Sequence, residues 1–491
     1  MRRSSASFAF HARDICHGFG PLPSVSATSN PNSIVRPPSA LRRALWLCTA
    51  DGLVATPLVT MSLPVNVFLA ALLTKGLHLP KETIGFIAAL PFACNFLQIF
   101  VSPLLGRWFR PKGITTTFAL LHASSWAILA VLLSFLPTDD PAAAGRWLAI
   151  WFFFSSFAAS LCGVAWNAWV QDWVPARLRG KYFSRRNRLL SFSTVAFLAS
   201  TGWALEAGQY ALWTFQAVIG VNTVLRFLSI RWIWQTPRTP TEAHAVPTGG
   251  FQTQLQIVRD EPSFLRFVLF GSVWAFAANL FGTFYYVFMF EIMQLSSLTV
   301  SFYTILGAAG GALSLPAWGL LLDRYGNKPV MALSLLAWQL PNFIWCLVTP
   351  EKHQLLPYLW FWGGMMGAGF VLGQFTLLLK LVPPRAKNLA IGVNLAVTSL
   401  VAAIAPVLGG AILTWALARW ADNSLHVYHA CFAALPLLSL AAAALLLRVH
   451  EPKASRFTSV VGAMRSVRTI SGIFGLTFFV NYVFYRPRKR G

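Results

Sequence analysis

The sequence predicts an all-α integral membrane protein with twelve transmembrane helices, arranged as two six-helix halves. The first observation is composition: 56% of the 491 residues are hydrophobic, only 11% are charged, and the mean hydropathy is +0.59. Soluble domains carry roughly 25% charged residues. The second observation is that apolar windows of about 20 residues, the length that crosses a bilayer, recur twelve times. The third is that two polar turns of the first half recur in the second.

The apolar windows place the twelve spans near residues 45–74, 83–105, 114–136, 146–170, 189–209, 212–234, 266–289, 298–322, 329–349, 354–381, 388–415 and 428–449. They group into an N-terminal six-helix bundle over residues 45–234 and a C-terminal six-helix bundle over residues 264–449. Between them, residues 235–263 hold three prolines and a glycine pair before a more helix-like stretch. This composition predicts a cytoplasmic central linker.

The two ends of the chain are predicted to be polar or amphipathic. Residues 1–44 are rich in Ser, Pro and Arg and lack the apolar core of a secretory signal, which predicts a disordered basic segment. An organellar transit peptide and a start codon assigned too early are alternatives. Residues 450–491 end in RPRKR after a short apolar run. We therefore expect a basic, amphipathic cytoplasmic tail on the inner membrane face.

The net charge of +24 is distributed unevenly along the chain. If the N-terminus is cytoplasmic, all but five of the 39 Lys and Arg lie on the cytoplasmic side or at inner helix ends, the exceptions being Lys75, Lys81, Arg146, Lys352 and Arg419. That bias is the positive-inside pattern and predicts that both termini are cytoplasmic. The expected partner of this charge is anionic inner-leaflet lipid rather than nucleic acid.

Catalytic and metal motifs are not found in the sequence. The six cysteines mostly fall inside predicted helices without paired spacing, and the nine histidines form no metal-binding pattern. Free cysteine packs as a small hydrophobic residue. We therefore expect neither an enzyme nor a bound metal or cofactor.

An internal repeat relates the two halves. At an offset of 213 residues, GRWFRPKG (106–113) aligns with GLLLDRYG (319–326), in each case in the turn after the second span. At an offset of 208 residues, WVPARLRGKYF (173–183) aligns with LVPPRAKNLAI (381–391), in each case after the fourth span. Two matches in equivalent turns indicate a duplicated six-helix unit.

The second-half turn resembles the loop signature G-x-x-x-D-R-x-G-x-K/R of the major facilitator superfamily of secondary transporters, through Gly319, Asp323, Arg324, Gly326 and Lys328. The resemblance implies two pseudo-symmetric bundles related by an axis along the membrane normal, with alternating access around a site near the midplane. It implies a permease for a small organic solute, acting as a monomer and coupled to protons, in a bacterial cytoplasmic (inner) membrane. A non-transporting sensor or scaffold on the same fold is the alternative.

The charges of these turns predict a cytoplasmic latch. Asp323 is expected to accept hydrogen bonds from free N–H groups at the start of the eleventh span, because a helix N-terminus favours an anion. In the first half Arg110 stands where Asp323 does, which departs from the family pattern. We expect Asp172 to supply the missing carboxylate by pairing with Arg110 or with the group around Arg179. The alternatives are a turn that only fixes topology, and an Asp172 that pairs within its own loop.

Asp51 is the candidate coupling residue. It lies about 12 Å along the first helix from Arg43, at a rise of about 1.5 Å per residue, and an acid inside a span is costly to insert. Gly52, Pro57 and Pro64 follow and predict a bent or broken helix. A carboxylate at this depth suits a proton carrier. Pairing with Arg42, Arg43 or a loop arginine at the interface is the alternative.

The family resemblance implies that the first, fourth, seventh and tenth helices line the cavity. Besides Asp51, their polar and aromatic residues are then the candidates for substrate binding: Trp166, Asn167, Trp274, Asn279, Tyr285, Tyr286, Trp362 and Gln374. Polar side chains also form hydrogen bonds between helices in membranes, which is the structural alternative for each of them.

Overall fold

The computed structural model describes residues 39–137, 139–236, 251–451, 454–455 and 457. Side chains are not described for a few residues inside helices, among them Asp172. The chain divides into two compact units, residues 1–43 and residues 44–491, and the account below is that of the second. The predicted N-terminal segment, most of the predicted linker and the predicted tail lie outside the described residues.

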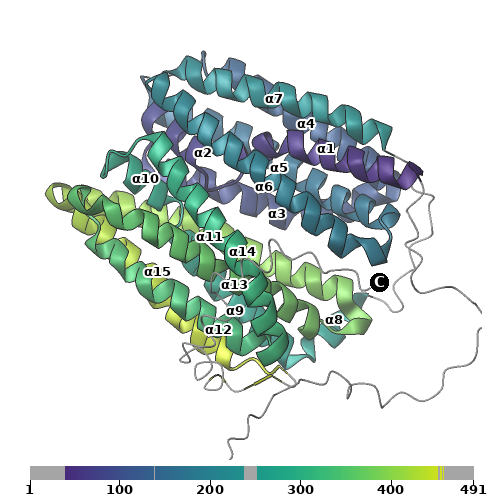
Figure 1. The fold of residues 1–491 in the computed structure, drawn as a ribbon. Coiled ribbons are helices and arrows are strands. Elements are labelled where there is room, and N and C mark those ends of the chain that lie inside the picture. The colour runs from purple at the N-terminus through teal and green to yellow at the C-terminus, as the bar shows by residue number, and fades with distance from the viewer. Residues whose placement is uncertain (1–38, 138, 237–250, 452–453, 456, 458–491) are drawn as a thin grey trace, which may run out of the picture. The chain divides into compact units, whose positions relative to one another are not determined.

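The first half is helical throughout its described part (Figure 1). Its elements are α1 (Ser39–Met61), α2 (Val67–Ala71), η1 (Leu72–Gly76), α3 (Lys81–Trp108), α4 (Pro111–Leu132), α5 (Pro141–Trp173), α6 (Ala176–Ala207) and α7 (Leu212–Gln235).

The second half begins with a short amphipathic helix, α8 (Phe251–Arg259), which lies in the stretch predicted as the linker. The elements that follow are α9 (Pro262–Leu280), α10 (Phe284–Glu291), α11 (Ser297–Tyr325), α12 (Asn327–Gln339), η2 (Leu340–Leu347), η3 (Pro350–Leu355), α13 (Leu356–Leu381), η4 (Pro384–Ala386), α14 (Lys387–Arg419), η5 (Ala421–Asn423) and α15 (Ser424–Leu447).

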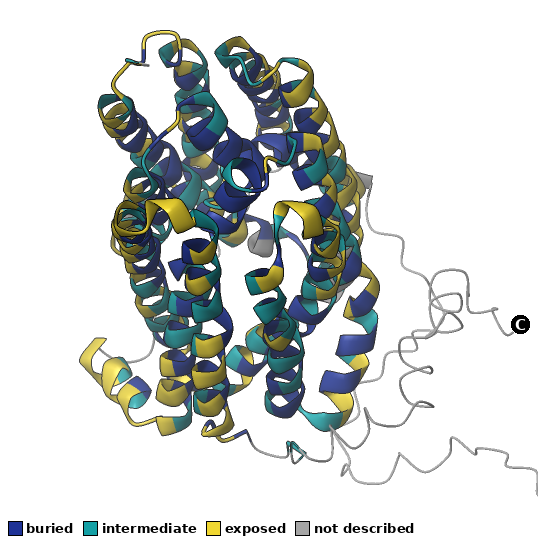
Figure 2. Ribbon diagram, turned by 90° about the vertical axis from the view of Figure 1, so that its left-hand side faces the viewer, coloured by how far each residue is buried: buried dark blue, intermediate teal, exposed yellow. Residues whose placement is uncertain are grey.

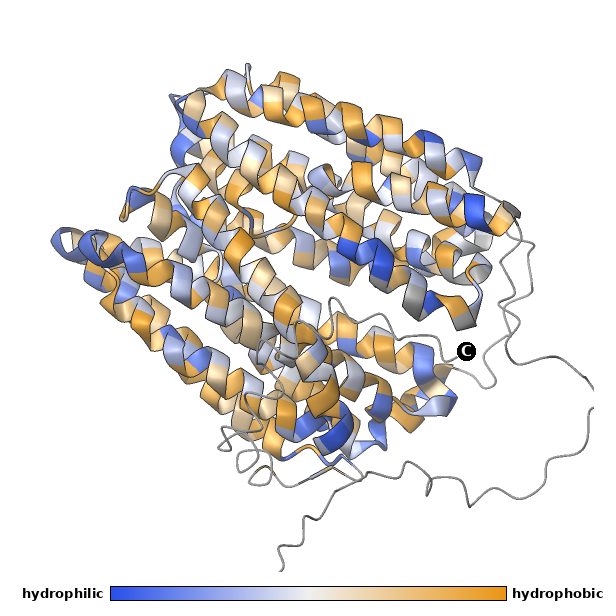
Figure 3. Ribbon diagram, in the orientation of Figure 1, coloured by the Kyte–Doolittle hydropathy of each residue, from blue (hydrophilic) through white to orange (hydrophobic). Residues whose placement is uncertain are grey.

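Twelve of these helices or joined helix pairs, in the part of the chain that the structure describes, are long and apolar enough to cross a membrane. The predicted all-α, twelve-span fold class is therefore confirmed. Figure 3 shows apolar residues along most of the length of these helices, with polar residues gathered toward their ends. Many large apolar side chains are exposed, among them Phe154 and Trp203. Such a surface fits hydrocarbon and is costly in water.

The first span of each half is interrupted. In the first half α1 stops at Met61 and α2 begins at Val67, so the predicted break near Pro64 is present. The side chain of Asn66 bridges the gap: its Nδ2 donates to the carbonyl of Met61 at 3.0 Å, and its Oδ1 accepts from the N–H of Leu69 at 2.8 Å. In the second half a turn at residues 281–283 separates α9 from α10. Broken spans of this kind surround the binding sites of transporters.

Within the first half, α4 packs against α5 and α7, and α3 packs against α5. Within the second half, α13 packs against α11 and α12, and α9 packs against α14 and α15. Between the halves, α3 packs against α14 and α6 against α11, and α2 also contacts α10 and α11. The largest apolar core includes residues from both halves, such as Phe68 of α2 and Phe288 of α10. Figure 2 shows these buried residues along the helix faces that meet other helices.

Candidate functional site

We call the end of the helices at which α1 begins and α15 ends the termini end, and the opposite end the far end. The turns between α3 and α4, α5 and α6, α11 and α12, and α13 and α14 lie at the termini end, because each span reverses the direction of the chain. The predicted latch residues belong to these turns. The predicted coupling residue lies inside α1.

Asp51 forms an ion pair within the first half. Its Oδ1 lies 3.2 Å from Nη1 of Arg226 on α7, and 5% of each residue is exposed. The same Nη1 donates to Oγ of Ser229 at 2.9 Å, while Nε of Arg226 has no partner. Arg226 does not extend to the membrane interface but stays buried. An opposite charge 175 positions away in the chain holds it inside, because a lone buried charge is far more costly than a paired one.

His122 on α4 fills a structural role beside this pair. Nε1 of Trp126 donates to Nε2 of His122 at 3.1 Å, and Oγ of Ser62 lies 3.0 Å from the same nitrogen. Because Nε2 accepts from the indole, the neutral ring carries its proton on Nδ1. The buried histidine is thereby hydrogen-bonded, as buried polar groups in proteins usually are.

A second buried arginine, Arg186 on α6, adjoins the same part of α1. Its guanidinium lies 4.7 Å from the ring centre of Trp166, and its Nε donates a long hydrogen bond of 3.4 Å to the carbonyl of Cys48. A Cβ added at Gly52 would lie 2.2 Å from its Nη2, so a larger residue there would displace the guanidinium from this position. Arg186 is 8% exposed. Sequence reasoning treated it as part of a basic loop.

The candidate Trp166 therefore lies beside a buried cation, whereas Asn167, the next residue on α5, is exposed. Trp166 is half-buried and also contacts the ring of Phe183 with 6.4 Å between ring centres. Of the substrate-binding candidates, Trp166 is the one that the structure brings next to Arg186, close to Asp51.

The two tyrosine candidates of α10 are buried in the second half. Tyr285 stacks on Phe432 with 4.2 Å between ring centres and also contacts Trp345, while its hydroxyl has no partner. The hydroxyl of Tyr286 lies 3.4 Å from Oγ1 of Thr304. These rings pack within their own half, and only the unpartnered hydroxyl of Tyr285 is left for a ligand.

The other second-half candidates are half-buried or exposed. Trp274 lies 4.7 Å from Phe370 between ring centres, and Nδ2 of Asn279 donates to a carbonyl of its own helix at 2.8 Å. Nε1 of Trp362 donates to a carbonyl of α12 at 2.7 Å. Gln374 is half-buried on α13. Their substrate-binding role stays a prediction.

At the termini end of the second half, the carboxylate that reaches a helix N-terminus belongs to Glu451. Its Oε1 accepts from the N–H of Asn327 at 3.1 Å and its Oε2 from the N–H of Lys328 at 2.6 Å, at the first turn of α12. Lys380 at the end of α13 donates to Oε1 at 3.1 Å. Glu451 is 5% exposed. This single carboxylate ties the turn after α11 to the end of α13 and to the chain after α15.

Asp323 is exposed, and among the described residues no hydrogen bond or ion pair joins it to the start of α14. Arg324 lies over the ring of Tyr325, 5.3 Å from its centre. Gly326 has a φ of +91°, as the tight turn requires. A Cβ at Gly319 would meet nothing within 4 Å, so no other helix packs closely against this glycine. The latch through Asp323 stays a prediction.

The first-half turn is held by Lys112. Its Nζ donates to the carbonyl of Trp234 at 3.0 Å and to that of Thr236, at the end of α7. Lys328 does the same in the second half, donating to the carbonyl of Val449 at 2.9 Å, near the end of α15. A cation at a helix C-terminus compensates the free carbonyls and the helix dipole. Sequence reasoning missed this shared contact.

The predicted pairing of Asp172 lies outside the described side chains. Arg110 is exposed and precedes the first turn of α4, and Nε of Arg179 donates to the carbonyl of Val174 at 2.9 Å. The exchange of carboxylates between the two halves therefore remains a prediction.

Polar contacts join the two halves at the far end. Lys81 at the start of α3 forms an ion pair with Glu291 at the end of α10. Nζ of Lys75 donates to Oε1 of Gln294 at 2.8 Å. Burial lowers the pKa of Lys75, and the Glu291 carboxylate partly offsets this shift.

Close backbone contacts reinforce this far-end seam. A Cβ at Gly85 of α3 would lie 2.2 Å from the carbonyl oxygen of Pro406 on α14, and a Cβ at Gly410 would lie 2.7 Å from the carbonyl oxygen of Lys81. The hydroxyl of Tyr210 accepts from the N–H of Ser297 at 2.9 Å. The APVLGG stretch (405–410) of α14 therefore packs closely against α3.

A groove of about 620 Å³ lies near the far end between α3 and α5. Its walls are mainly apolar, with Phe86, Ile150 and Phe154 among them, and Glu82 and Arg146 complete the lining. The exposed fractions of these three apolar side chains are large, which is typical of a surface that faces lipid. None of the predicted substrate-binding residues lines this groove.

Comparison with known proteins points to one family. The sequence profile described as Major Facilitator Superfamily matches residues 53–314 and 273–486. No curated protein sequence matches the chain. A mutant of the nucleoside transporter NupG has a TM-score of 0.66 at 14% identity, over 83% of this chain and 100% of that one. A D-xylose-proton symporter has a TM-score of 0.66 at 15% identity, over 84% and 98% of the two chains. A bacterial homologue of the human lysosomal transporter Spinster has a TM-score of 0.57 at 15% identity, over 83% and 94%.

Proposed function

Because the chain belongs to the major facilitator superfamily, and is thus a non-enzymatic multi-pass membrane transporter, we propose that it moves a small organic solute by alternating access. The observation that carries this proposal is the far-end seam, where Lys81 pairs with Glu291 and Gly85 packs against α14. Opening the far end must break these contacts, whereas the ties made by Glu451 and Lys112 lie within single halves and can persist. That difference supports two rigid halves that rock against each other.

In this proposal the protein lies in the inner membrane of a bacterium, with both termini in the cytoplasm. It acts as a monomer. The positive-inside charge bias supports this orientation. The far end then faces outward, and the turns held by Glu451 and Lys112 face the anionic inner leaflet.

Asp51 couples transport to protons in this proposal. Its carboxylate is buried, and Arg226 is its charged partner at 3.2 Å. A proton on Asp51 removes the negative charge and weakens the ion pair, which changes the interaction of α1 with α7. Solute and proton can then influence each other's binding, because any ligand that alters one equilibrium alters the other.

The substrate is bound by side chains of the first, fourth, seventh and tenth spans. Trp166 is the favoured contact because a buried cation lies against its ring. Tyr285 is favoured in the second half because its buried hydroxyl has no partner.

The first-half latch is proposed to use Asp172 with Arg110, and a charge exchange tests it. If the pair forms during transport, the single variants Asp172→Arg and Arg110→Asp lose uptake and the double variant regains it. A double variant as poor as the singles would exclude the pairing.

Flux measurements in proteoliposomes test the proposed function. Purified protein is reconstituted with an imposed pH gradient, and solutes selected by thermal shift are followed for uptake and for exchange without a gradient. We expect the gradient to drive uptake, and Asp51→Asn to keep exchange but lose the response to pH. Glu206→Gln is the matched control, since Glu206 is an exposed acid near the far end of α6. Absence of movement for every solute would refute transport, and a normal pH response in Asp51→Asn would refute the coupling role.

A further inference from the structure

The buried charges of the first half do not balance. Arg186 and Arg226 are both more than 90% buried, and both adjoin Asp51 or the glycine that follows it. Asp51 is the only acid among the described buried residues of this half. Two cations and one anion leave an excess of one positive charge among the described buried residues of this half.

The contacts of Arg186 do not compensate this excess. The ring of Trp166 at 4.7 Å attracts a cation, but the guanidinium stays charged. The carbonyl of Cys48 accepts from Nε at 3.4 Å, which is a weak geometry. No acceptor is described for Nη1 or Nη2 of Arg186, and neither atom is among the enclosed atoms without a partner. The outer edge of the guanidinium is therefore reachable, and its Nη1 and Nη2 have no hydrogen-bond acceptor among the described residues.

The guanidinium of Arg226 also has hydrogen-bond donors that an anion could satisfy. Its Nη1 is shared between Asp51 and Ser229, and its Nε is enclosed without any partner. A buried guanidinium with unused donors is costly, and charges inside a membrane protein mark ligand or ion pathways.

We propose that the substrate is a small organic monoanion that carries a carboxylate, and that Arg186 binds this carboxylate while Trp166 contacts the apolar body of the molecule. This inference rests on the proposed function, since it names the solute class of that site. One negative charge cancels the excess of one. The planar fork of a guanidinium matches a carboxylate with two parallel hydrogen bonds.

The number of charges separates monocarboxylates from uncharged solutes and from phosphate esters. An uncharged sugar or nucleoside would leave the excess in place. A phosphate ester carries about two negative charges and would invert the balance, unless Asp51 took up a proton. A monocarboxylate brings the three side chains and the ligand to neutrality with Asp51 ionised.

Thermal-shift and calorimetric titrations test the proposal with matched probes. A panel of monocarboxylates is compared with the corresponding primary amides and with inorganic phosphate, on the full-length protein in detergent. We expect at least one monocarboxylate to bind saturably and its amide to bind at least about tenfold more weakly. Arg186→Gln should weaken carboxylate binding by roughly ten- to a hundredfold, since hydrogen bonds to charged groups are the strong ones.

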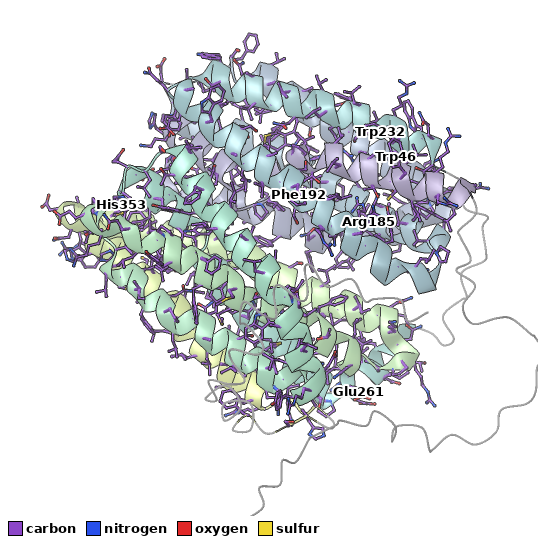
Figure 4. The ribbon with its side chains drawn as sticks, in the orientation of Figure 1. Trp46, Arg185, Phe192, Trp232, Glu261 and His353 are labelled. Atoms are coloured by element: carbon purple, nitrogen blue, oxygen red, sulfur yellow. The ribbon has the colours of Figure 1, made fainter. Side chains whose placement is uncertain are left out.

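Two further variants keep the result interpretable. Arg186→Lys keeps the charge and loses the fork, so it should bind the carboxylate with intermediate affinity even if Arg186→Gln fails to fold. Arg185→Gln is the matched control, because Arg185 is the neighbouring residue on α6 and is exposed (Figure 4). It should bind like the unmodified protein.

Equal binding of acids and amides, or unchanged binding in Arg186→Gln, would overturn the inference. Transport of uncharged solutes that carboxylates do not inhibit would also overturn it, while leaving the proposed transport function intact. Carboxylate binding that depends on Arg186, in a protein that moves no solute, would support the site and refute the proposed function.

Discussion

Substituting Gly85 by alanine should destabilise one access state. Gly85 of α3 faces the carbonyl oxygen of Pro406 on α14, and the added Cβ would lie 2.2 Å from that oxygen and 3.2 Å from Cα of Gly410. The first distance is roughly 1.2 Å short of the 3.4 Å at which ordinary contacts begin. Because the obstacle is backbone, neither helix can relieve it by rotating a side chain.

The cost falls on the conformation in which the far end is closed. Overpacking of this kind costs about 1–3 kcal/mol. The contact is lost when α3 and α14 separate, so the open conformation does not bear this cost. A difference of about 1–3 kcal/mol changes the ratio of the two conformations by roughly 5- to 150-fold toward the far-end-open form.

Distances between spin labels on far-end turns of the two halves measure this shift, in a background without the native cysteines. We expect the longer distances to gain population in Gly85→Ala and the rate of solute exchange to fall. Gly106→Ala is the matched control on the same helix, because a Cβ there would meet nothing within 4 Å. An unchanged distance distribution in Gly85→Ala would show that α3 and α14 do not separate at this point.

The remaining predictions concern the charged contacts at the two ends. Glu451→Gln should lower the apparent Tm, because one buried carboxylate accepts hydrogen bonds from two N–H groups of α12 and from Lys380. Asp323→Asn, at an exposed position, should leave the Tm unchanged. An equal decrease in Tm in both variants would contradict the role assigned to Glu451. The single variants Lys81→Glu and Glu291→Lys should each favour the far-end-open form in spin-label distances, and the double exchange should restore the closed form. Failure of the double exchange would mean that this partly buried pair contributes little to closing the far end, as is common for ion pairs near the surface.

Composition and helix-breaking residues predict much of the fold. The lengths of the apolar stretches suffice to count the spans, because the bilayer fixes how long a helix must be. Pro57 and Pro64 indicate the weak point of the first span, although the structure shows that Asn66 bridges it. The Gly-Gly pair at the end of APVLGG predicts close packing, and Gly410 supplies it against α3.

The pairing of charges could not be predicted in the same way. Asp51 lies on the first span of the first half and Arg226 on its last span. No short-range sequence pattern connects two residues that are so far apart in the chain. In a membrane helix both the lipid-facing side and the packed side are apolar, so periodicity does not reveal which side faces inward. Arg186 stands in a basic run in which Arg185 and Arg188 are exposed, and only the rotation of α6 places it against Trp166.

Glu451 was missed for a related reason. The internal repeat aligns Asp323 with Arg110, and both residues are therefore candidates from the sequence. Glu451 follows the last span, where sequence pattern gives no sign of a return contact. The repeat therefore does not point to the carboxylate at the start of α12, and the latch through Asp323 at the start of α14 stays a separate prediction.

The two lysine contacts, Lys112 on the end of α7 and Lys328 on the end of α15, bear on how a duplicated protein diverges. Their carbonyl partners Trp234 and Leu447 are 213 positions apart, which is the period of the repeat, whereas the two lysines are 216 apart. The long flexible side chain absorbs a displacement of three residues and still reaches the same carbonyls. Both halves thus make the same contact with a lysine, from positions that the repeat does not align.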